Sequence, residues 1–238
     1  MENLFIIAPA YNESANIEKF INDWYPIVEK YDVDGTSRLV IVNDGSKDNT
    51  YEIVKECAET MPLLTPLTKT NGGHGSAVLY GYRFAIQNHA GFVFQTDSDG
   101  QTNPAEFIKF WNLRHEYDAI IGNRPVREDG LFRKFVQRTL LFILRIFFGV
   151  NIPDSNAPFR LMRSELIIKY IKKIPDNFNL PNVMLTVYCS YFHEKVKFVD
   201  ISFKPRQGGK NSINVKRILK IGWQALGDFY IMRKHINN

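Results

Sequence analysis

Three oxygen-bearing side chains stand at alternate positions where an apolar run of the sequence ends. The run 91–97 closes on Asp97, and Asp99 and Gln101 follow it. Hard divalent cations such as Mg²⁺ and Mn²⁺ are held by one or two carboxylates, with substrate phosphates and water completing the ligands. Two carboxylates this close repel unless a cation or hydrogen-bond donors lie between them. The spacing is compatible with a cation site and equally with a simple turn, because Asp, Ser and Gly are common turn residues.

Two other segments carry groups suited to a nucleotide. Asp44, in "VNDGSKDNT", is either an acceptor for base N–H or ribose hydroxyl groups or part of a capped turn. Gly72, Gly73 and Gly75 precede a segment of helical length, where backbone N–H groups approach a phosphate or sugar easily. Their spacing matches neither the dinucleotide-binding fingerprint nor a P-loop. Neither segment decides the function by itself.

These residues need a scaffold that brings them together. Apolar runs typical of strands cover 4–9, 38–44, 62–68, 91–97 and 117–123, and segments of helical length cover 17–31, 48–60, 74–89 and 104–116. Strands that alternate with helices indicate a mostly parallel sheet with helices on both faces. Ligands bind such a sheet at the carboxyl ends of its strands. The candidate residues are therefore expected at one edge of the sheet.

Composition narrows the class of protein. The chain has 238 residues, of which 45% are hydrophobic, so it can bury a substantial core. Cys57 and Cys189 form neither a disulfide framework nor a zinc-binding spacing, which fits a reducing cytosolic setting. The apolar N-terminal run is short and lacks a basic start, so we expect a first strand rather than a signal peptide. No run reaches the ~18 apolar residues of a membrane-spanning helix. The net charge of +5 is compatible with a nucleic acid, an anionic lipid or a phosphorylated substrate.

The order of the segments after the predicted strands is more specific than any one of them. "APAYNE", "VNDGSKDNT", "NGGHGSA", "TDSDGQ" and "GNRP", in this spacing, resemble the GT-A glycosyltransferases of family 2 over roughly residues 4–125. The resemblance implies an α/β fold, a single Rossmann-like GT-A nucleotide-diphospho-sugar transferase domain. It also implies roles for particular residues: the nucleotide is held by Pro9, Tyr11, Glu13 and Asp44, and the diphosphate is handled through Mg²⁺ or Mn²⁺ by Asp97 and Asp99. We add Gly73 as a donor contact, and His74 as a loop residue near the donor rather than a catalyst.

Later motifs resemble one branch of that family. The Asp-x-Asp-x-Gln run, Gly122 to Arg124, "DSNAPFRLM" and "RQGGKNS" are similar to dolichyl-phosphate mannose synthases and polyprenyl-phosphate glycosyltransferases. This resemblance makes Gln101 a third metal ligand and Arg124 and Arg160 phosphate-binding positions. We add Arg206 as a donor contact, with a further role in steering the acceptor phosphate. Two departures stand out: Ala157-Pro158-Phe159 replaces Ser-Gly-Phe, and Asn211-Ser212 replaces Ser-Lys. Lys210 is the candidate replacement for the missing lysine.

The acceptor can also be argued from chemistry. A sugar hydroxyl needs a positioned general base, whereas a phosphate monoester is already an anion at neutral pH and needs cations. Residues 178–186, where many family 2 enzymes resemble one another in carrying an acidic base, contain no Asp or Glu, while arginines are plentiful: Arg124, Arg127, Arg133, Arg160 and Arg206, with Lys210. We therefore predict an inverting, metal-dependent transfer of sugar from a nucleoside diphosphate to dolichyl or undecaprenyl phosphate. Asp99, Arg124 and Arg160 are the predicted catalytic residues.

Two segments of the second half have the character of amphipathic helices. In the run 130–150, Lys134, Arg138 and Arg145 fall within about 40° on a helical wheel, and Phe and Leu fill most of the remaining circumference. Such a helix can lie in a membrane interface, or be a core helix whose arginines reach acidic partners. The run 213–232 has a similar basic start. We predict donor and metal binding in residues 1–125, acceptor binding in 126–238, and peripheral attachment to the cytoplasmic face of the membrane.

Two other functions remain open. One is a family 2 enzyme that glycosylates a sugar hydroxyl, with Asp154 or Asp176 as the base. The other is a non-catalytic protein that binds nucleotide sugars. Nucleic-acid binding is disfavoured, because the basic residues cluster with aliphatic side chains rather than with exposed aromatic ones. The sequence identifies neither the sugar, the nucleotide base nor the oligomeric state.

Overall fold

The fold is built on one mostly parallel sheet. The computed structural model describes residues 2–125, 131–176, 178–204, 215–234 and 236, and gives only the backbone of 131–134 and 215–221. Seven strands lie in the order β3-β2-β1-β4-β6-β5-β7. Their bounds are β1 Leu4–Ala10, β2 Arg38–Asn43, β3 Leu64–Thr68, β4 Phe92–Gln95, β5 Ala119–Asn123, β6 Arg160–Arg163 and β7 Val196–Asp200. β6 runs antiparallel to β4 and β5, and the other pairings are parallel. The predicted α/β fold is confirmed.

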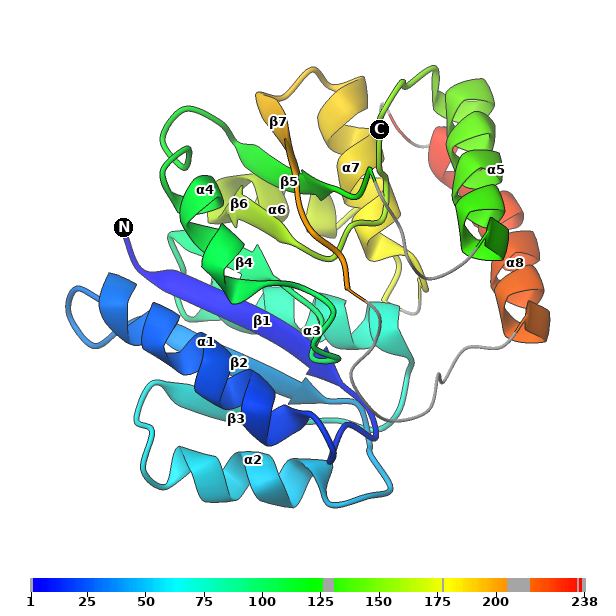
Figure 1. The fold of residues 1–238 in the computed structure, drawn as a ribbon. Helices are drawn as coiled ribbons and strands as arrows, with labels where there is room; N and C mark the ends of the chain where they lie inside the picture. Colours follow the sequence, from blue (N-terminus) through cyan, green and yellow to red (C-terminus); the bar gives the residue numbers. More distant parts are fainter. Residues whose placement is uncertain (1, 126–130, 177, 205–214, 235, 237–238) are drawn as a thin grey trace.

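Helices cover both faces of this sheet (Figure 1). One core contains side chains of α1 (Ile17–Tyr31), α2 (Thr50–Ala58) and α4 (Phe107–Trp111), which a 3₁₀ turn at Pro104–Glu106 precedes. The opposite core contains side chains of α3 (His74–Gln87), α6 (Ser164–Ile171) and α7 (Pro181–Tyr191). β1 is buried along its whole length, as expected for a central strand covered on both faces. Because both faces of the sheet are covered by apolar side chains, polar functional groups are expected at the ends of its strands.

The helix that follows β1 has the bounds and the buried face that its sequence predicts. α1 buries Ile17, Phe20, Ile21, Trp24 and Val28 on one face, as the helical spacing predicts. The predicted helix 104–116 is shorter, because the chain leaves the helical conformation after Trp111 and continues in turns to β5.

Two strands lie outside the predicted set. β6 reads only "RLMR", with an arginine at each end, and β7 has the half-exposed pattern of an edge strand. β6 enters between β4 and β5, with Arg160 opposite Gln95 and Ile121. Both halves of the chain therefore contribute strands to the same sheet.

The two longest helices of the described chain lie side by side and contribute side chains to the second core. They are α5 (Leu131–Phe148) and α8 (Val215–Lys234), on the right of Figure 1. Their inner sides include Leu144, Phe148, Ala225 and Phe229, which are buried. Within the described part of the chain, no helix combines the length and apolar character needed to cross a membrane.

Candidate functional site at the carboxyl edge of the sheet

The loops after β1, β2 and β4 are bonded to one another. Asp44 donates its backbone N–H to the carbonyl of Ala10, and Asn12 donates its own to Ser46 Oγ at 3.0 Å. Ser98 Oγ donates to the carbonyl of Pro9 at 2.8 Å. The predicted convergence of these segments at one edge of the sheet is therefore seen, with Pro9 buried beside the loop that carries the two aspartates.

Asp44 holds the glycine loop. Its Oδ1 accepts from Lys69 Nζ at 2.8 Å and from the N–H of Gly72 at 2.9 Å, and its Oδ2 accepts from the N–H of Gly73 at 2.7 Å. Gly73 has φ +87°, a backbone conformation that favours glycine. The geometry thus shows an organising role for Asp44, and Oδ2 keeps one acceptor position of its usual two.

The start of α3 is packed tightly against the loop before α7. A Cβ on Gly75 would lie 2.3 Å from the carbonyl oxygen of Phe178 and 2.7 Å from backbone atoms of Asn179. Only glycine fits here without displacing backbone, so this contact sets where the first turn of α3 begins.

Asp97 and His74 form an ion pair beside the same loop. His74 Nε2 lies 2.9 Å from Asp97 Oδ1, and both side chains are partly exposed. Burial alone would raise the pKa of Asp97, but His74, with the more distant Arg124 and Arg160, holds that pKa below its ordinary value. Asp97 is therefore a carboxylate at neutral pH.

Asp99 and Gln101 shape the turn after Asp97. Asp99 Oδ1 accepts the N–H of Gln101 at 3.2 Å, and Gly100 between them has φ +74°. Gln101 donates its side-chain amide to the carbonyl of Lys204 at 2.9 Å. The turn-only explanation and the cation site are thus not exclusive, because the turn itself places both carboxylates.

The side chains of the turn after β4 form a set of oxygen ligands. Among the described residues, no group of three or more His, Cys, Asp or Glu side chains is arranged to hold a metal ion. Asp97, Asp99 and Gln101 offer two carboxylates and an amide, a hard-oxygen set that suits Mg²⁺ or Mn²⁺ once a diphosphate supplies further oxygens. The residues present therefore fit a cation that arrives with its substrate.

Arg124 is held by an acidic residue 30 positions later in the chain. Its Nε and Nη2 donate to Asp154 Oδ2 and Oδ1 at 2.7 and 3.0 Å, and Asp154 is 0% exposed. The ring centroid of Phe203 lies 4.9 Å from Arg124 Cζ. Within the described residues, Nη1 makes no hydrogen bond.

Arg160 differs from its prediction as a phosphate-binding residue. It is 0% exposed, and its guanidinium donates to the carbonyls of Ala157 and Asn182. Burial lowers the pKa of Arg160, although nearby groups including Tyr82 and Asp154 oppose this. In this structure Arg160 ties β6 to α7, and its donors are directed at backbone rather than at the open edge of the sheet.

The other predicted residues fall into three groups. Glu13 is buried in the loop before α1 and accepts from Asn16 Nδ2 at 2.8 Å, while Tyr11 is half-buried in the same loop, just after β1. Arg206, with Arg127 and Lys210, lies outside the described residues, as do the side chains of Arg133 and Lys134. Asp176, named as an alternative base, is exposed and pairs with Arg83. Arg83 lies nine residues after His74, about 13 Å along α3 and away from the strand ends.

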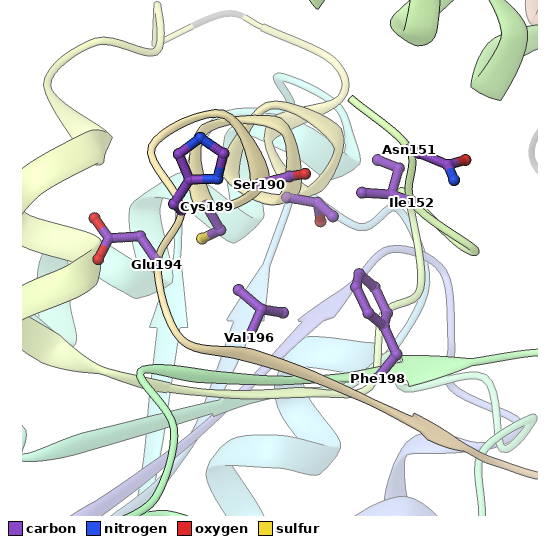
Figure 2. Close-up of a pocket in the computed structure, with 9 residues that line it drawn as sticks. Asn151, Ile152, Cys189, Ser190, Glu194, Val196 and Phe198 are labelled. Carbon is purple, nitrogen blue, oxygen red and sulfur yellow. The ribbon is translucent and has the colours of Figure 1, made fainter. Parts of the chain in front are cut away.

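A pocket among the described residues lies away from the predicted site residues. It has a volume of about 340 Å³ and is lined by α7, the start of β7 and the segment 151–152. Figure 2 shows the lining side chains. None of the described residues that line it is a predicted site residue, so this pocket is not evidence for the position of the predicted site. A second hollow of about 330 Å³ lies between α1 and the loop after β4, against Gly100, Thr102 and Lys204.

Comparison with known proteins decides the family. A model of Glycosyl transferase family 2 matches residues 5–171, which is more than half of the chain. The chain belongs to glycosyl transferase family 2. It is therefore a glycosyltransferase, as the order of its strand-end motifs predicts.

Relatives within the family include transferases named for undecaprenyl or dolichyl phosphate. These names fit the predicted branch of polyprenyl-phosphate glycosyltransferases. An undecaprenyl-phosphate 4-deoxy-4-formamido-L-arabinose transferase of Pectobacterium atrosepticum is 22% identical over 229 residues, covering 95% of this chain and 67% of the relative. A dolichyl-phosphate beta-glucosyltransferase of Trichomonas vaginalis is 30% identical over 171 residues, covering 65% and 51%. The chain thus spans about two thirds and half of these family 2 relatives.

Solved structures share the fold of this family 2 chain. Glucosyl-3-phosphoglycerate synthase from Mycobacterium tuberculosis, in complex with Mn²⁺ and uridine-diphosphate-glucose, superposes with a TM-score of 0.70 at 17% identity. The match covers 98% of this chain and 79% of that one. It confirms the predicted GT-A fold.

Some contacts of this family 2 site were missed by sequence reasoning. The Lys69–Asp44, His74–Asp97 and Arg124–Asp154 pairs each join residues at least 23 positions apart. One signal was available for His74, the only histidine placed at a strand end. Nothing in the sequence marked Asp154 as the partner of Arg124 rather than as a base.

Proposed function

We propose that this chain transfers a sugar, with inversion, from a nucleoside diphosphate to a polyprenyl phosphate such as dolichyl or undecaprenyl phosphate. One observation carries the proposal. Three features lie at the carboxyl edge of the sheet: the glycine loop bonded to Asp44, the Asp97–Gln101 turn, and Arg124. The acidic neighbour of Arg124, Asp154, is already paired with it. The first two suit a nucleotide diphosphate, and the third suits an anionic acceptor.

The donor site is assigned to the loops after β1, β2 and β4. Asp44 organises the glycine loop and keeps one acceptor position on Oδ2, which suits an N–H or hydroxyl of the nucleotide. Pro9, Tyr11 and Glu13 stand beside it at the end of β1. Asp97, Asp99 and Gln101 would hold Mg²⁺ or Mn²⁺, which when bound neutralises charge that builds on the leaving diphosphate.

The acceptor site is assigned to the neighbourhood of Arg124. Its Nη1 donors are directed away from Asp154 and suit a phosphate oxygen, which a guanidinium binds with defined geometry. A phosphate monoester needs no general base, and Asp154 is fully buried and paired. Arg160 is reassigned to a supporting role beneath the site, and Arg206 remains a predicted donor contact.

A polyprenyl phosphate acceptor lies in a membrane, and exposed side chains of α5 and α8 suit binding to one. On α5, Phe135, Phe142 and Ile146 lie within about 40° of one another at 100° per residue and are 64–67% exposed. Arg138 and Arg145 are exposed alongside them. On the neighbouring α8, Trp223 is 80% exposed. Apolar side chains flanked by cations favour the interface of an anionic bilayer, where a polyprenyl phosphate resides. We assign residues 1–125 to the donor, except for Arg124 at the end of this range, and 126–238 to the acceptor and this surface, at the cytoplasmic face.

The rival acceptor, a sugar hydroxyl, requires a base. Both carboxylates considered for that role are unsuitable in this structure: Asp154 accepts from Arg124 and from the N–H of Asn156, and Asp176 lies on the surface beside Arg83. A non-catalytic binding role is disfavoured by membership of the transferase family.

The first test identifies the donor. Thermal stabilisation is measured against UDP-, GDP- and dTDP-sugars with Mn²⁺ and with EDTA, since a ligand that binds the folded state raises its stability. We expect one class of nucleotide to stabilise the protein in a cation-dependent way. Transfer from that donor is then measured to undecaprenyl phosphate and, in parallel, to a saccharide acceptor. Activity on the saccharide alone would contradict the proposal.

The second test addresses the turn after β4. Asp99→Ala should abolish transfer to undecaprenyl phosphate while the circular dichroism spectrum stays unchanged. Glu116→Ala, which removes an exposed carboxylate before β5, serves as the matched control and should keep full activity. Unchanged turnover in Asp99→Ala would refute the metal role.

A further inference from the structure

A short segment after β7 is fastened to the loop that carries the predicted cation ligands. Ser202 donates both its N–H and its Oγ to Glu106 Oε2, at 3.0 and 2.9 Å. Lys204 exchanges two bonds with Gln101: its N–H donates to the Gln101 carbonyl, and its carbonyl accepts from Gln101 Nε2, each at 2.9 Å. The residue between them, Phe203, is therefore fixed on both sides to the loop after β4.

Phe203 also touches the other half of the site. It is 8% exposed, and the centroid of its ring lies 4.9 Å from Arg124 Cζ. Asp154 accepts hydrogen bonds from two nitrogens along one edge of the same guanidinium. An edge contact restrains a planar group along its plane, whereas an aromatic face restrains it across the plane. The guanidinium of Arg124 is thus restrained by two neighbours, the carboxylate of Asp154 and the ring of Phe203.

We propose that Phe203 is a positioning residue for Arg124, which it holds in register with the Asp97–Gln101 loop so that Nη1 meets the phosphate of the acceptor. The proposal rests on the proposed function, in which Arg124 binds that phosphate. Phe203 itself need not touch the substrate. Its position is set by the bonds of Ser202 and Lys204 to the loop after β4, so that the distance between the acceptor phosphate and the donor diphosphate depends on this ring.

The test measures binding of two probes to the full chain. Farnesyl phosphate, a short polyprenyl phosphate, reports on the acceptor site, and UDP or GDP with Mn²⁺, whichever binds more tightly, reports on the donor site. Loss of a cation–π contact weakens binding about 2- to 30-fold. We expect Phe203→Leu to raise the Kd of farnesyl phosphate by that factor, with the Kd of the nucleotide unchanged. Phe203→Tyr, which keeps the ring, should restore wild-type affinity, and farnesol, which lacks the phosphate, should bind both variants equally.

A double-mutant cycle shows whether Phe203 acts through Arg124. Arg124→Lys keeps a charge opposite Asp154 but removes the planar guanidinium. If the ring works through that plane, Phe203→Leu should add less than about twofold in the Arg124→Lys background, because the effects of coupled residues are not additive. Should Phe203→Leu fail to fold, Phe203→Met, whose flexible side chain adapts to the space left by the ring, takes its place in the cycle.

A matched control removes a different ring from beneath an arginine. Trp111 lies under Arg114, with Cζ 4.4 Å from the ring centroid, near the amino end of β4. Trp111→Leu should lower thermal stability yet leave the ratio of the two Kd values unchanged. Two results would overturn the role of Phe203 and leave the proposed function standing. One is an unchanged Kd for farnesyl phosphate in Phe203→Leu, and the other is an equal change of that Kd on adding Phe203→Leu to wild type and to Arg124→Lys. An unchanged Kd in Arg124→Lys itself would instead remove the acceptor role of Arg124, and with it the basis of the proposed site.

Discussion

Arg124 and Asp154 form a two-point ion pair, with nitrogen–oxygen distances of 2.7 and 3.0 Å, at the carboxyl edge of the sheet. The two side chains are 6% and 1% exposed. A carboxylate that is buried and paired in this way has little access to a substrate hydroxyl. The pair thus gives Asp154 the role of orienting Arg124.

The pair predicts a specific pattern of stability. Asp154→Ala leaves the Arg124 charge buried without a partner, which costs about 3–5 kcal/mol of unfolding free energy. The double variant Arg124→Met with Asp154→Leu should recover most of that loss, because it removes both buried charges. Urea unfolding followed by circular dichroism measures both values. If Asp154 were instead a general base, Asp154→Asn would lose activity without losing stability.

Gly75 offers a second test, on packing near the donor loop. Its Cβ position lies 2.3 Å from the carbonyl oxygen of Phe178, a backbone atom that cannot rotate away. Gly75→Ala should therefore destabilise the protein by about 1–3 kcal/mol and weaken nucleotide binding, because the start of α3 must shift. Thermal unfolding with and without the nucleotide measures both effects.

The control for Gly75 is another helical glycine. Gly222 in α8 has open space where its Cβ would lie. Gly222→Ala should raise stability by about 0.5–1 kcal/mol, since alanine loses less backbone entropy in a helix interior. A destabilised Gly222→Ala, or a neutral Gly75→Ala, would show that the packing inferred for these positions is wrong.

Glu194 makes stability depend on pH. Burial would raise its pKa, but hydrogen bonds from Lys169, at 2.6 Å, and from Tyr170 hold the pKa below its ordinary value of 4.5. A group whose pKa is lowered by folding stabilises the protein above its unfolded pKa and loses that contribution as the pH falls through its folded value. The advantage of wild type over Glu194→Gln in urea unfolding should be present at about pH 7 and shrink at about pH 3. Glu165→Gln, at an exposed carboxylate of α6, should match wild type at both. An advantage for the wild type that stays constant with pH would contradict the assignment.

The exposed stripe on α5 predicts binding to lipid vesicles. Burying a Phe side chain is worth about 1.5–3 kcal/mol, so Phe142→Ser should weaken binding to phosphatidylglycerol vesicles about tenfold or more. Sedimentation with vesicles measures the bound fraction, and added salt should lower it because Arg138 and Arg145 contribute through charge. Val33→Ser is the matched control, at an exposed apolar residue before β2. Equal loss in both variants would show that α5 is not the lipid-binding surface.

Several features of this protein were predictable because neighbouring residues encode them. The runs that became β1 to β5 are contiguous apolar stretches, and α1 shows its helical period directly. Once the strands are parallel, their carboxyl ends meet at one edge, so the convergence of Asp44, Gly73 and Asp97 followed from chain order alone. β6 could not be predicted in this way, because four residues with arginine at both ends carry no strand period.

The sequence by itself determined the fold class, the family and the segments that build the site. The tertiary structure decided what each charged side chain does there: Arg124 is gripped by Asp154, Asp44 holds the glycine loop, and Arg160 is enclosed by carbonyls. The physical reason is that strand and helix patterns arise from adjacent residues. The partner of a buried charge, by contrast, is set by which distant groups the packing brings within hydrogen-bonding distance after water has been excluded.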